Sequence, residues 1–264
     1  MGVPIFCVDA FTERPFAGNP AAVCILSEEH PDAWLQSVAA EMNLSATAFL
    51  WDEGDGWRLR WFTPRVEVDL CGHATLASAH TLWEEGLARA GTPLVFRTKS
   101  GALAAARRDD AIELDFPAEP AAPAPTPPGL IEALGVEAVS VGRNRLDFLV
   151  ELDSEDRLRR IHPRLPALAE ACGEARGVIV TAPSRASEFD FVSRFFAPSL
   201  GIDEDPVTGS AHCCLGPFWA ARLGKPALVG FQASRRGGVV GMRVADSRVF
   251  LGGRAVTVLR GELV

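Results

Sequence analysis

The alternation of hydrophobic and polar positions predicts the same series of elements twice along the chain. In the first half the pattern predicts a helix over residues 31–42, strands over 46–51 and 57–62, a helix over 72–87, and strand-like runs near residues 94, 102 and 111. In the second half it predicts a helix over 163–172, strands over 177–181 and 189–196, a helix over 209–223, and strand-like runs near 228, 239, 248 and 256. We therefore expect an internal repeat.

A proline-rich segment separates the two halves. Residues 117–129 read PAEPAAPAPTPPG, and proline supplies no backbone N–H and fixes φ, which excludes this segment from helices and central strands. We expect a linker here, with an N-terminal lobe over residues 1–118 and a C-terminal lobe over residues 119–264. The last strand can return to the first lobe.

The two central helices are apolar on nearly every side. Ala74–Ala79 and Ala211–Leu215 carry small and apolar residues all round, which is typical of a buried helix. We predict an α+β fold of two pseudo-symmetric lobes, each a strongly curved, mostly antiparallel sheet wrapped around its own central helix, with a cleft between the lobes. A single doubly wound sheet is the alternative, but the strands do not alternate with helices as that fold requires.

Charge and composition narrow the classes of partner. The 264 residues carry a formal net charge of −8, with a pI near 5.2, and the arginines are scattered. Such a surface repels a phosphate backbone, so nucleic acid is not expected as a partner. Because no apolar stretch reaches the roughly 20 residues of a spanning helix and the first residues do not resemble a signal peptide, we expect a cytoplasmic protein without a membrane partner.

The cysteines and tyrosines bear on the available chemistry. The six cysteines show no CxxC spacing, which favours buried thiols over a disulfide framework or a zinc site. Tyrosine is absent, which removes one common general acid. Catalysis is left to Asp, Glu, His, Cys and Ser.

Each central helix begins with a glycine, Gly72 or Gly209, and an acidic residue comes just before it, Asp69 or Asp205. The free amides and the positive dipole end of a helix start attract anions, and glycine lets a ligand approach the backbone closely. Facing each other across the predicted cleft, two such starts are expected to hold a small carboxylate.

Three stretches resemble the signatures of one family. Gly18-Asn19-Pro20-Ala21-Ala22-Val23, Cys71-Gly72-His73-Ala74-Thr75 and the run from Asp203 to His212 look like the signature stretches of the PhzF-like (phenazine biosynthesis) family, in the right order across nearly the whole chain. That family is similar in fold to diaminopimelate epimerase. The resemblance implies a homodimer that uses no metal or cofactor and shifts a proton on a small unsaturated carboxylic acid.

The same resemblance suggests roles for individual residues. It makes His73 and Asp205 polar members of the catalytic constellation and Ser210 a hydroxyl that positions the substrate. The family's substrate contacts fall on Asn19 and Ser45 in this chain. Two more residues, Gly72 and Gly209, are expected to donate backbone amides.

One position departs from the family. Its key acid/base is a glutamate in a Ser-Glu-Thr stretch, and the matching stretch here places Ala46 after Ser45. A proton shift between carbons needs a titratable group, which typically contributes ~10²–10⁴ in rate. The proton must then travel through Asp205, His73, a relocated carboxylate such as Asp69 or Glu41, or the substrate itself; otherwise the protein binds without turnover.

Several residues also have purely structural explanations. Asp205 can cap the turn before its helix, and Asn19 before Pro20 is an ordinary turn signal. His73 can be a satisfied core residue, although the helix start favours a neutral imidazole suited to hydrogen bonding. His212 lies further into its helix and is expected to be structural.

Cysteine and arginine offer weaker candidates. Cys71 before a helix start has the setting of a reactive thiol, but a two-thiol racemase needs a partner and the equivalent position before Gly209 holds Thr208. Arg60, Arg65 and Arg194 are able to pair with a ligand carboxylate, yet arginines at strand ends are more often solvated surface charges. We do not count on them.

Two classes of function remain. The first is a proton-shuttling, cofactor-independent isomerase or epimerase that acts on a small carboxylic or amino acid, with a thiol-based racemase as its less favoured variant. The second is a catalytically silent protein that binds a small carboxylate or amino-acid-like metabolite, and Ala46 is its main support.

Overall fold

The computed structural model describes residues 2–89 and 91–264, and the chain forms two compact units. The first unit takes in the chain up to Phe116 together with Phe250–Val264. The second unit is Pro117–Val249. The proline-rich segment begins the second unit.

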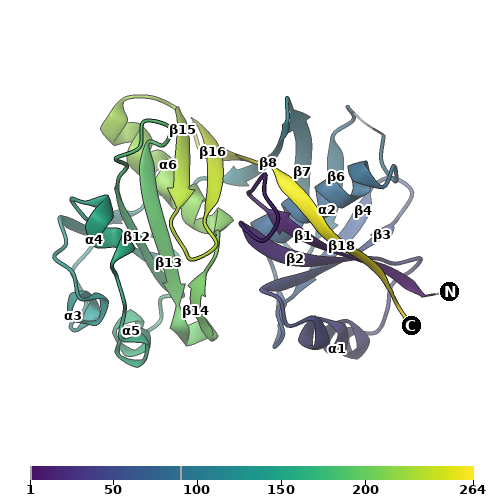
Figure 1. The fold of residues 1–264 in the computed structure, drawn as a ribbon, viewed down its shortest axis with the longest axis horizontal. Helices are drawn as coiled ribbons and strands as arrows, with labels where there is room; N and C mark the ends of the chain where they lie inside the picture. Colours follow the sequence, from purple (N-terminus) through teal and green to yellow (C-terminus); the bar gives the residue numbers. More distant parts are fainter. Residues whose placement is uncertain (1, 90) are drawn as a thin grey trace. The chain divides into compact units, whose positions relative to one another are not determined.

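The first unit is a curved sheet with two helices (Figure 1). Its strands are β1 (Val3–Ala10), β2 (Asn19–Ile25), β3 (Ala46–Asp52), β4 (Trp57–Phe62), β5 (Glu67–Val68), β6 (Leu94–Thr98), β7 (Gly101–Arg108), β8 (Ala111–Pro117) and β18 (Ala255–Leu263), and its helices are α1 (Asp32–Met42) and α2 (Gly72–Glu84). β18 pairs with β1, β1 with β2 and β3 with β4 in antiparallel fashion, whereas β2–β3 and β4–β6 are parallel. β6, β7 and β8 continue the sheet as antiparallel neighbours.

The second unit repeats this plan. It contains β9 (Ala122–Pro123), α3 (Leu130–Leu134), β10 (Ser140–Arg143), β11 (Asp147–Glu151), α4 (Glu155–Arg159), α5 (Leu165–Cys172), β12 (Gly177–Pro183), β13 (Phe191–Ala197), the 3-10 helix η1 (Pro198–Leu200), β14 (Ile202–Asp205), α6 (Gly209–Leu223), β15 (Ala227–Gln232) and β16 (Gly238–Ala245), followed by β17 (Arg248–Gly253). The pairs β10–β11 and β12–β13 are antiparallel, β11–β12 and β13–β15 are parallel, and β15–β16 is antiparallel. This is the order and sense of the first unit, so the predicted internal repeat is confirmed.

Strand register identifies equivalent positions in the two units. Trp61 lies opposite Ala48 and Val68, and Phe195 lies opposite Ile179 and Asp205. Counting back along β3 and β12 from these pairs makes Ala46 equivalent to Gly177 and Ser45 equivalent to Arg176. The counterpart of Asp205 is therefore Val68. Pairing Asp205 with Asp69, as the acidic residue ahead of each glycine suggested, was wrong by one position, because Asp205 lies four residues before Gly209 and Asp69 only three before Gly72.

Both central helices are buried as predicted. α2 is buried along most of its length and packs against β1, β2, β3 and β18, while α6 is buried from Ala211 to Gly216 and packs against β15 and β16. α2 ends at Glu84, three residues before the predicted end. Gly86 adopts a left-handed φ of 69°, which does not continue a right-handed helix.

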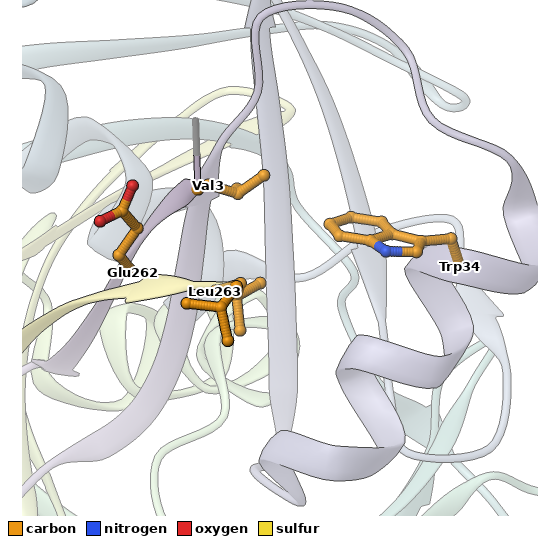
Figure 2. Close-up of a pocket in the computed structure, with 6 residues that line it drawn as sticks. Val3, Trp34, Glu262 and Leu263 are labelled. Atoms are coloured by element: carbon orange, nitrogen blue, oxygen red, sulfur yellow. The ribbon is translucent and has the colours of Figure 1, made fainter.

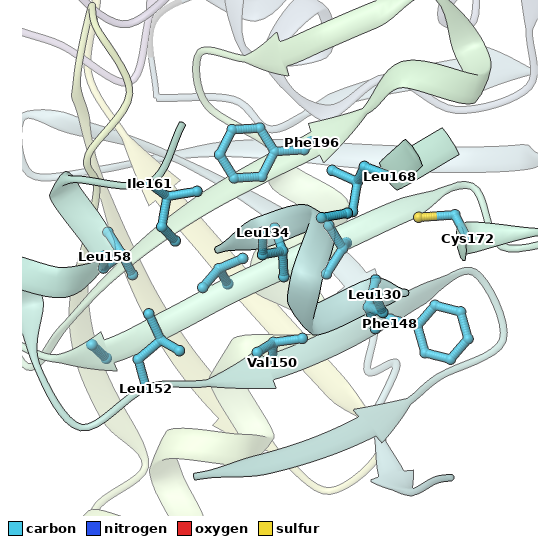
Figure 3. Close-up of a cluster of buried hydrophobic side chains, with 14 of the residues drawn as sticks. Leu130, Leu134, Phe148, Val150, Leu152, Leu158, Ile161, Leu168, Cys172 and Phe196 are labelled. Atoms are coloured by element: carbon cyan, nitrogen blue, oxygen red, sulfur yellow. The ribbon is translucent and has the colours of Figure 1, made fainter. Parts of the chain in front are cut away.

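Each unit has its own hydrophobic core. In the second unit, side chains of α3, α4 and α5 pack on β11, β12 and β13, with Leu134, Val150 and Leu168 among them (Figure 3). In the first unit, α1 contributes Leu35 and Ala39 to a cluster with strand residues. The short helices α3 and α4 and the strands β1, β2, β10 and β11 were not predicted from the pattern.

The cysteines differ in their exposure to solvent. None of the six cysteines forms a disulfide bond; four are buried, and Cys7 and Cys71 are partly exposed. Within the described ranges, no helix has the length and apolar character needed to cross a membrane.

Gly177 provides a test of the packing of β12 against β13. A methyl group at this position would lie 2.4 Å from the backbone oxygen of Phe196 and 2.9 Å from the Phe195 ring. Because backbone cannot move aside as a flexible side chain does, we expect Gly177→Ala to lower the free energy of unfolding by about 1–3 kcal/mol, measured by urea denaturation.

Gly261→Ala on β18 is the matched control, because its added methyl would meet side-chain carbons at 3.6 and 3.7 Å. We expect it to change the free energy of unfolding by less than about 0.5 kcal/mol. Equal stability of the two variants would contradict the tight packing of β12 against β13.

Candidate functional site

The structure brings Asn19, Ser45 and His73 together in the first unit, and we call them the first-unit cluster. The Ser45 hydroxyl oxygen lies 2.7 Å from Asn19 Oδ1, 3.0 Å from the Pro20 carbonyl oxygen and 3.2 Å from His73 Nε2. Asn19 begins β2, Ser45 immediately precedes β3, and His73 is the second residue of α2. Because β2 and β3 are parallel neighbours, residues far apart in sequence meet at one end of the sheet.

Hydrogen-bond directions in this cluster assign the imidazole tautomer. The hydroxyl of Ser45 has one hydrogen, and Asn19 Oδ1 and the Pro20 carbonyl are both acceptors. Ser45 therefore accepts from His73, and Nε2 carries the imidazole hydrogen. Nδ1 is left as an acceptor, and the sulfur of Cys71 lies 3.5 Å from it.

Burial keeps the His73 imidazole neutral. The side chain is 7% exposed, and loss of solvation lowers its pKa to about 4. At neutral pH His73 is thus a donor through Nε2 and an acceptor through Nδ1. It forms part of a chain of hydrogen bonds that runs through Ser45 to Asn19.

Ala46 is the first residue of β3 and follows Ser45 directly. It is 1% exposed and pairs with Ala21 on β2. Position 46, where the resemblance to the family leads us to expect a glutamate, is thus a buried alanine directly after Ser45.

The relocated carboxylates considered above lie on the surface. The Asp69 side chain is 67% exposed and lies 3.2 Å from the ammonium group of Lys99. Glu41 is also exposed, on α1. Neither carboxylate has the partly desolvated setting that an acid/base needs.

Asp205 has such a setting, at the end of β14 and just before the turn that leads to α6. It is 9% exposed, and the Thr208 hydroxyl donates to its Oδ2 at 2.5 Å. Buried Gln232 holds the turn by donating to the Asp205 carbonyl at 2.8 Å and accepting from the Thr208 amide at 2.9 Å. Sequence reasoning missed Gln232, since it comes from β15, and no local motif marks it.

The start of α6 carries Gly209 and Ser210, and an arginine contacts the second of them. Arg176 Nη2 donates to the Ser210 hydroxyl oxygen at 2.8 Å, while its guanidinium forms a two-point pair with the fully buried carboxylate of Asp147. Sequence reasoning missed both Arg176 and Asp147. The repeat register was the signal that could have found Arg176, because it stands where Ser45 stands in the first unit.

Two of the three weaker arginine candidates are not solvated surface charges. The Arg60 side chain is 11% exposed and lies 2.8 Å from Glu67, and Arg194 is 10% exposed and lies 2.7 Å from Glu204. Each guanidinium joins a strand to the short strand that leads to a central helix, so both are structural pairs. Arg65 is exposed as expected.

His212 is buried inside α6 as a structural residue would be. Its Nδ1 lies 2.8 Å from the Thr208 carbonyl oxygen, and burial lowers its pKa to about 4. This contact braces the first turn of the helix. The imidazole also lies 6.1 Å from the ring of Phe191, between ring centres.

A groove on the first unit is lined by Gly2, Val3, Trp34, Glu262, Leu263 and Val264 (Figure 2). Trp34 of α1 faces Val3 of β1 and Leu263 of β18 across it. The charged side chain in this lining is a carboxylate, which repels an acidic ligand. The groove therefore differs in residues and in charge from the first-unit cluster. Among the residues that the structure describes, no group of three or more His, Cys, Asp or Glu side chains is arranged to hold a metal ion.

The similar proteins carry isomerase or PhzF-family names. An uncharacterized isomerase of Halalkalibacterium halodurans is 54% identical over all of this chain and 99% of its own length. Another uncharacterized isomerase, from Pseudomonas aeruginosa, is 50% identical over 97% of this chain and 96% of its own length. The crystal structure of a PhzF family protein from Enterococcus faecalis matches with a TM-score of 0.95 and 43% identity, and each chain is covered completely.

More distant structures share the fold alone. A probable proline racemase from Agrobacterium radiobacter matches with a TM-score of 0.66 at 12% identity, over 99% of this chain and 93% of its own. The predicted α+β architecture is thus confirmed as one that racemases also use. A family model described as phenazine biosynthesis-like protein matches residues 8–261, and the chain therefore belongs to the phenazine biosynthesis-like (PhzF) family.

Proposed function

We propose that this protein is a cofactor-independent isomerase or epimerase that moves a proton on a small carboxylic or amino acid, and that its proton-transfer step is slow because Ala46 replaces a carboxylate. The observation that carries the proposal is the first-unit cluster, in which Asn19, Ser45 and neutral His73 form a hydrogen-bonded chain and Ala46 directly follows Ser45. The isomerase names of its relatives support the same class of reaction.

The chemistry requires a group that takes a proton from one carbon and returns it to another. Neutral His73 is a weak base, because burial disfavours its protonated form. Asp205 is the better carrier, since it is a largely buried carboxylate that accepts from the Thr208 hydroxyl. We assign the residual proton transfer to Asp205 and a hydrogen-bonding role toward the substrate to His73.

A catalytically silent binding protein is the second candidate. Ala46 favours it, because it cannot transfer a proton. Asp69 and Glu41 are exposed, so Asp205 is left as the one desolvated carboxylate among the three that the sequence suggested. A two-thiol racemase has less support. The counterpart of Cys71 is Thr208, and its hydroxyl donates to Asp205.

Restoring the carboxylate separates these candidates. We expect Ala46→Glu to raise the exchange of substrate C–H for solvent deuterium by about 10²–10⁴, the range that a positioned acid/base contributes. The exchange is followed by NMR over a panel of small unsaturated and amino acids. In the unmodified protein we expect slow exchange that falls at least about tenfold in Asp205→Asn.

Ala46→Gln is the matched control, because it adds the same bulk without a titratable group. It is expected to remain as slow as the unmodified protein. If neither the unmodified protein nor Ala46→Glu exchanges deuterium into any acid of the panel, the isomerase proposal is wrong. Exchange by Ala46→Glu alone would identify the unmodified protein as the silent binder.

The neutral state of His73 predicts a dependence on pH. Because its folded pKa of about 4 lies below the ordinary 6.5, the unfolded chain binds a proton first as the pH falls. The stability that neutral His73 contributes is therefore complete above pH 6.5 and is lost between pH 6.5 and 4, by up to about 3 kcal/mol.

NMR titration of the imidazole checks this directly, with the His73 signal assigned by its absence in His73→Gln. We expect a midpoint near pH 4 and a smaller loss of stability on acidification in His73→Gln than in the unmodified protein. A midpoint at or above pH 6.5 would show that His73 becomes protonated near neutral pH and is not the neutral donor described above.

A further inference from the structure

The contact between Arg176 and Ser210 joins a strand end to the start of α6. Arg176 comes just before β12 and Ser210 is the second residue of α6. Nη2 of Arg176 lies 2.8 Å from the Ser210 hydroxyl oxygen. The arginine side chain is 29% exposed, so one side of this contact faces solvent.

The direction of this hydrogen bond is fixed by chemistry. A guanidinium group has five N–H donors and no acceptor, so the Ser210 oxygen must accept. The hydrogen of the Ser210 hydroxyl is then left to donate elsewhere. Within residues 2–89 and 91–264, no protein group accepts it, and an acceptor from a ligand is able to take that place.

Arg176 is held rigidly enough to impose this direction. Nε donates to Asp147 Oδ1 at 3.0 Å, and Nη2 also donates to the second oxygen of the same carboxylate. The guanidinium carbon lies 5.3 Å from the centre of the Phe195 ring. Asn144 in turn fixes the start of β11, because its Oδ1 accepts from the amides of Leu146 and Asp147 at 2.8 and 2.7 Å.

The internal repeat supplies an independent argument. Arg176 is equivalent to Ser45, and Ser210 is equivalent to His73, since each follows the glycine of its helix. The contact between Ser45 and His73 at 3.2 Å thus has its counterpart in the contact between Arg176 and Ser210. In both units, a side chain at the strand end orients the second residue of the central helix.

We propose that Arg176 is a positioning residue for the substrate carboxylate. It occupies the acceptor side of the Ser210 hydroxyl, so that this hydroxyl donates to a carboxylate oxygen of the small acid. The inference rests on the proposed function. The charge of Arg176 is largely balanced by Asp147. Arg176 therefore contributes by orienting Ser210 and not through its net charge.

The alternative is that Arg176 does no more than neutralise Asp147. A double-mutant cycle distinguishes the two, because a residue that acts through Ser210 has no effect on affinity once that hydroxyl is removed. Arg176→Lys is the variant of choice. It keeps a positive charge beside the buried carboxylate but lacks the planar fork that reaches two partners at once.

The probes are crotonate, fumarate and benzoate, with crotonamide as the uncharged control, and the readout is the dissociation constant from calorimetry. For the acids that bind, we expect Ser210→Ala and Arg176→Lys each to weaken binding about tenfold, the effect of losing one hydrogen bond to a charged group. In the Ser210→Ala background, Arg176→Lys is expected to add less than about twofold.

Matched controls guard against loss of structure. Arg222 forms a similar two-point pair with Glu151 near the other end of α6, and Arg222→Lys is expected to leave the dissociation constants unchanged. Should Arg176→Lys unfold the protein, the pair Asp147→Asn with Arg176→Gln removes both charges together. That double variant is expected to weaken acid binding by the same factor as Arg176→Lys.

Additive losses, or unchanged affinity in Arg176→Lys, would overturn the proposal, and so would the failure of every acid to bind the unmodified protein. The outcome for the proposed function is separate. If the acids bind with the expected coupling but exchange no deuterium in any variant, the carboxylate site is supported and the isomerase proposal is wrong.

Discussion

In each unit, a nearly buried arginine on the strand before the central helix pairs with a glutamate on the short strand that leads into that helix. Arg60 lies 2.8 Å from Glu67, and Arg194 lies 2.7 Å from Glu204. Each guanidinium also lies over a phenylalanine two residues ahead on its own strand, Phe62 or Phe196. Arg60 also lies 2.8 Å from Asp32, and Arg194 also donates to the carbonyls of Leu158 and Ile161, so each guanidinium has several partners.

These pairs anchor the short strands that lead into the glycine-led helices. Glu67 and Glu204 each lie five residues before the glycine of the following helix, so each ion pair holds the chain shortly before His73 or Ser210. The parallel strand pairs β2–β3 and β11–β12 then bring a second side chain to each helix start, Ser45 in one unit and Arg176 in the other. We infer that the group missing from this plan is the carboxylate that the family resemblance leads us to expect at position 46, where the chain has an alanine.

Much of the fold and part of the site follow from the sequence. The repeated order of elements and the apolar central helices predict the architecture, because periodicity and burial are encoded locally in each segment. The family signatures point to Asn19, His73, Asp205 and Ser210. Their assigned roles remain predictions, although three residues of the first-unit cluster, Asn19, Ser45 and His73, lie within hydrogen-bond reach of one another.

The misses have one physical cause, which is contact between residues distant in sequence. Asp147, Arg176 and Gln232 reach the start of α6 through strand pairing, and spacing within one segment does not reveal such pairing. The error on Asp69 has a different cause, because Asp69 lies three residues before its glycine whereas Asp205 lies four before its own, and both the count and the register align Asp205 with Val68. Arg194 looked like a surface charge because its partners, Glu204 and the carbonyls of Leu158 and Ile161, are ten or more residues away.

The central claim is that the chain retains the means to bind its substrate and lacks one proton carrier. Calorimetric titration of the unmodified protein with an acid that Ala46→Glu turns over tests this most directly. The account predicts dissociation constants that agree within about threefold, because the absent carboxylate serves proton transfer more than binding. Saturable binding by Ala46→Glu together with no binding by the unmodified protein would contradict it.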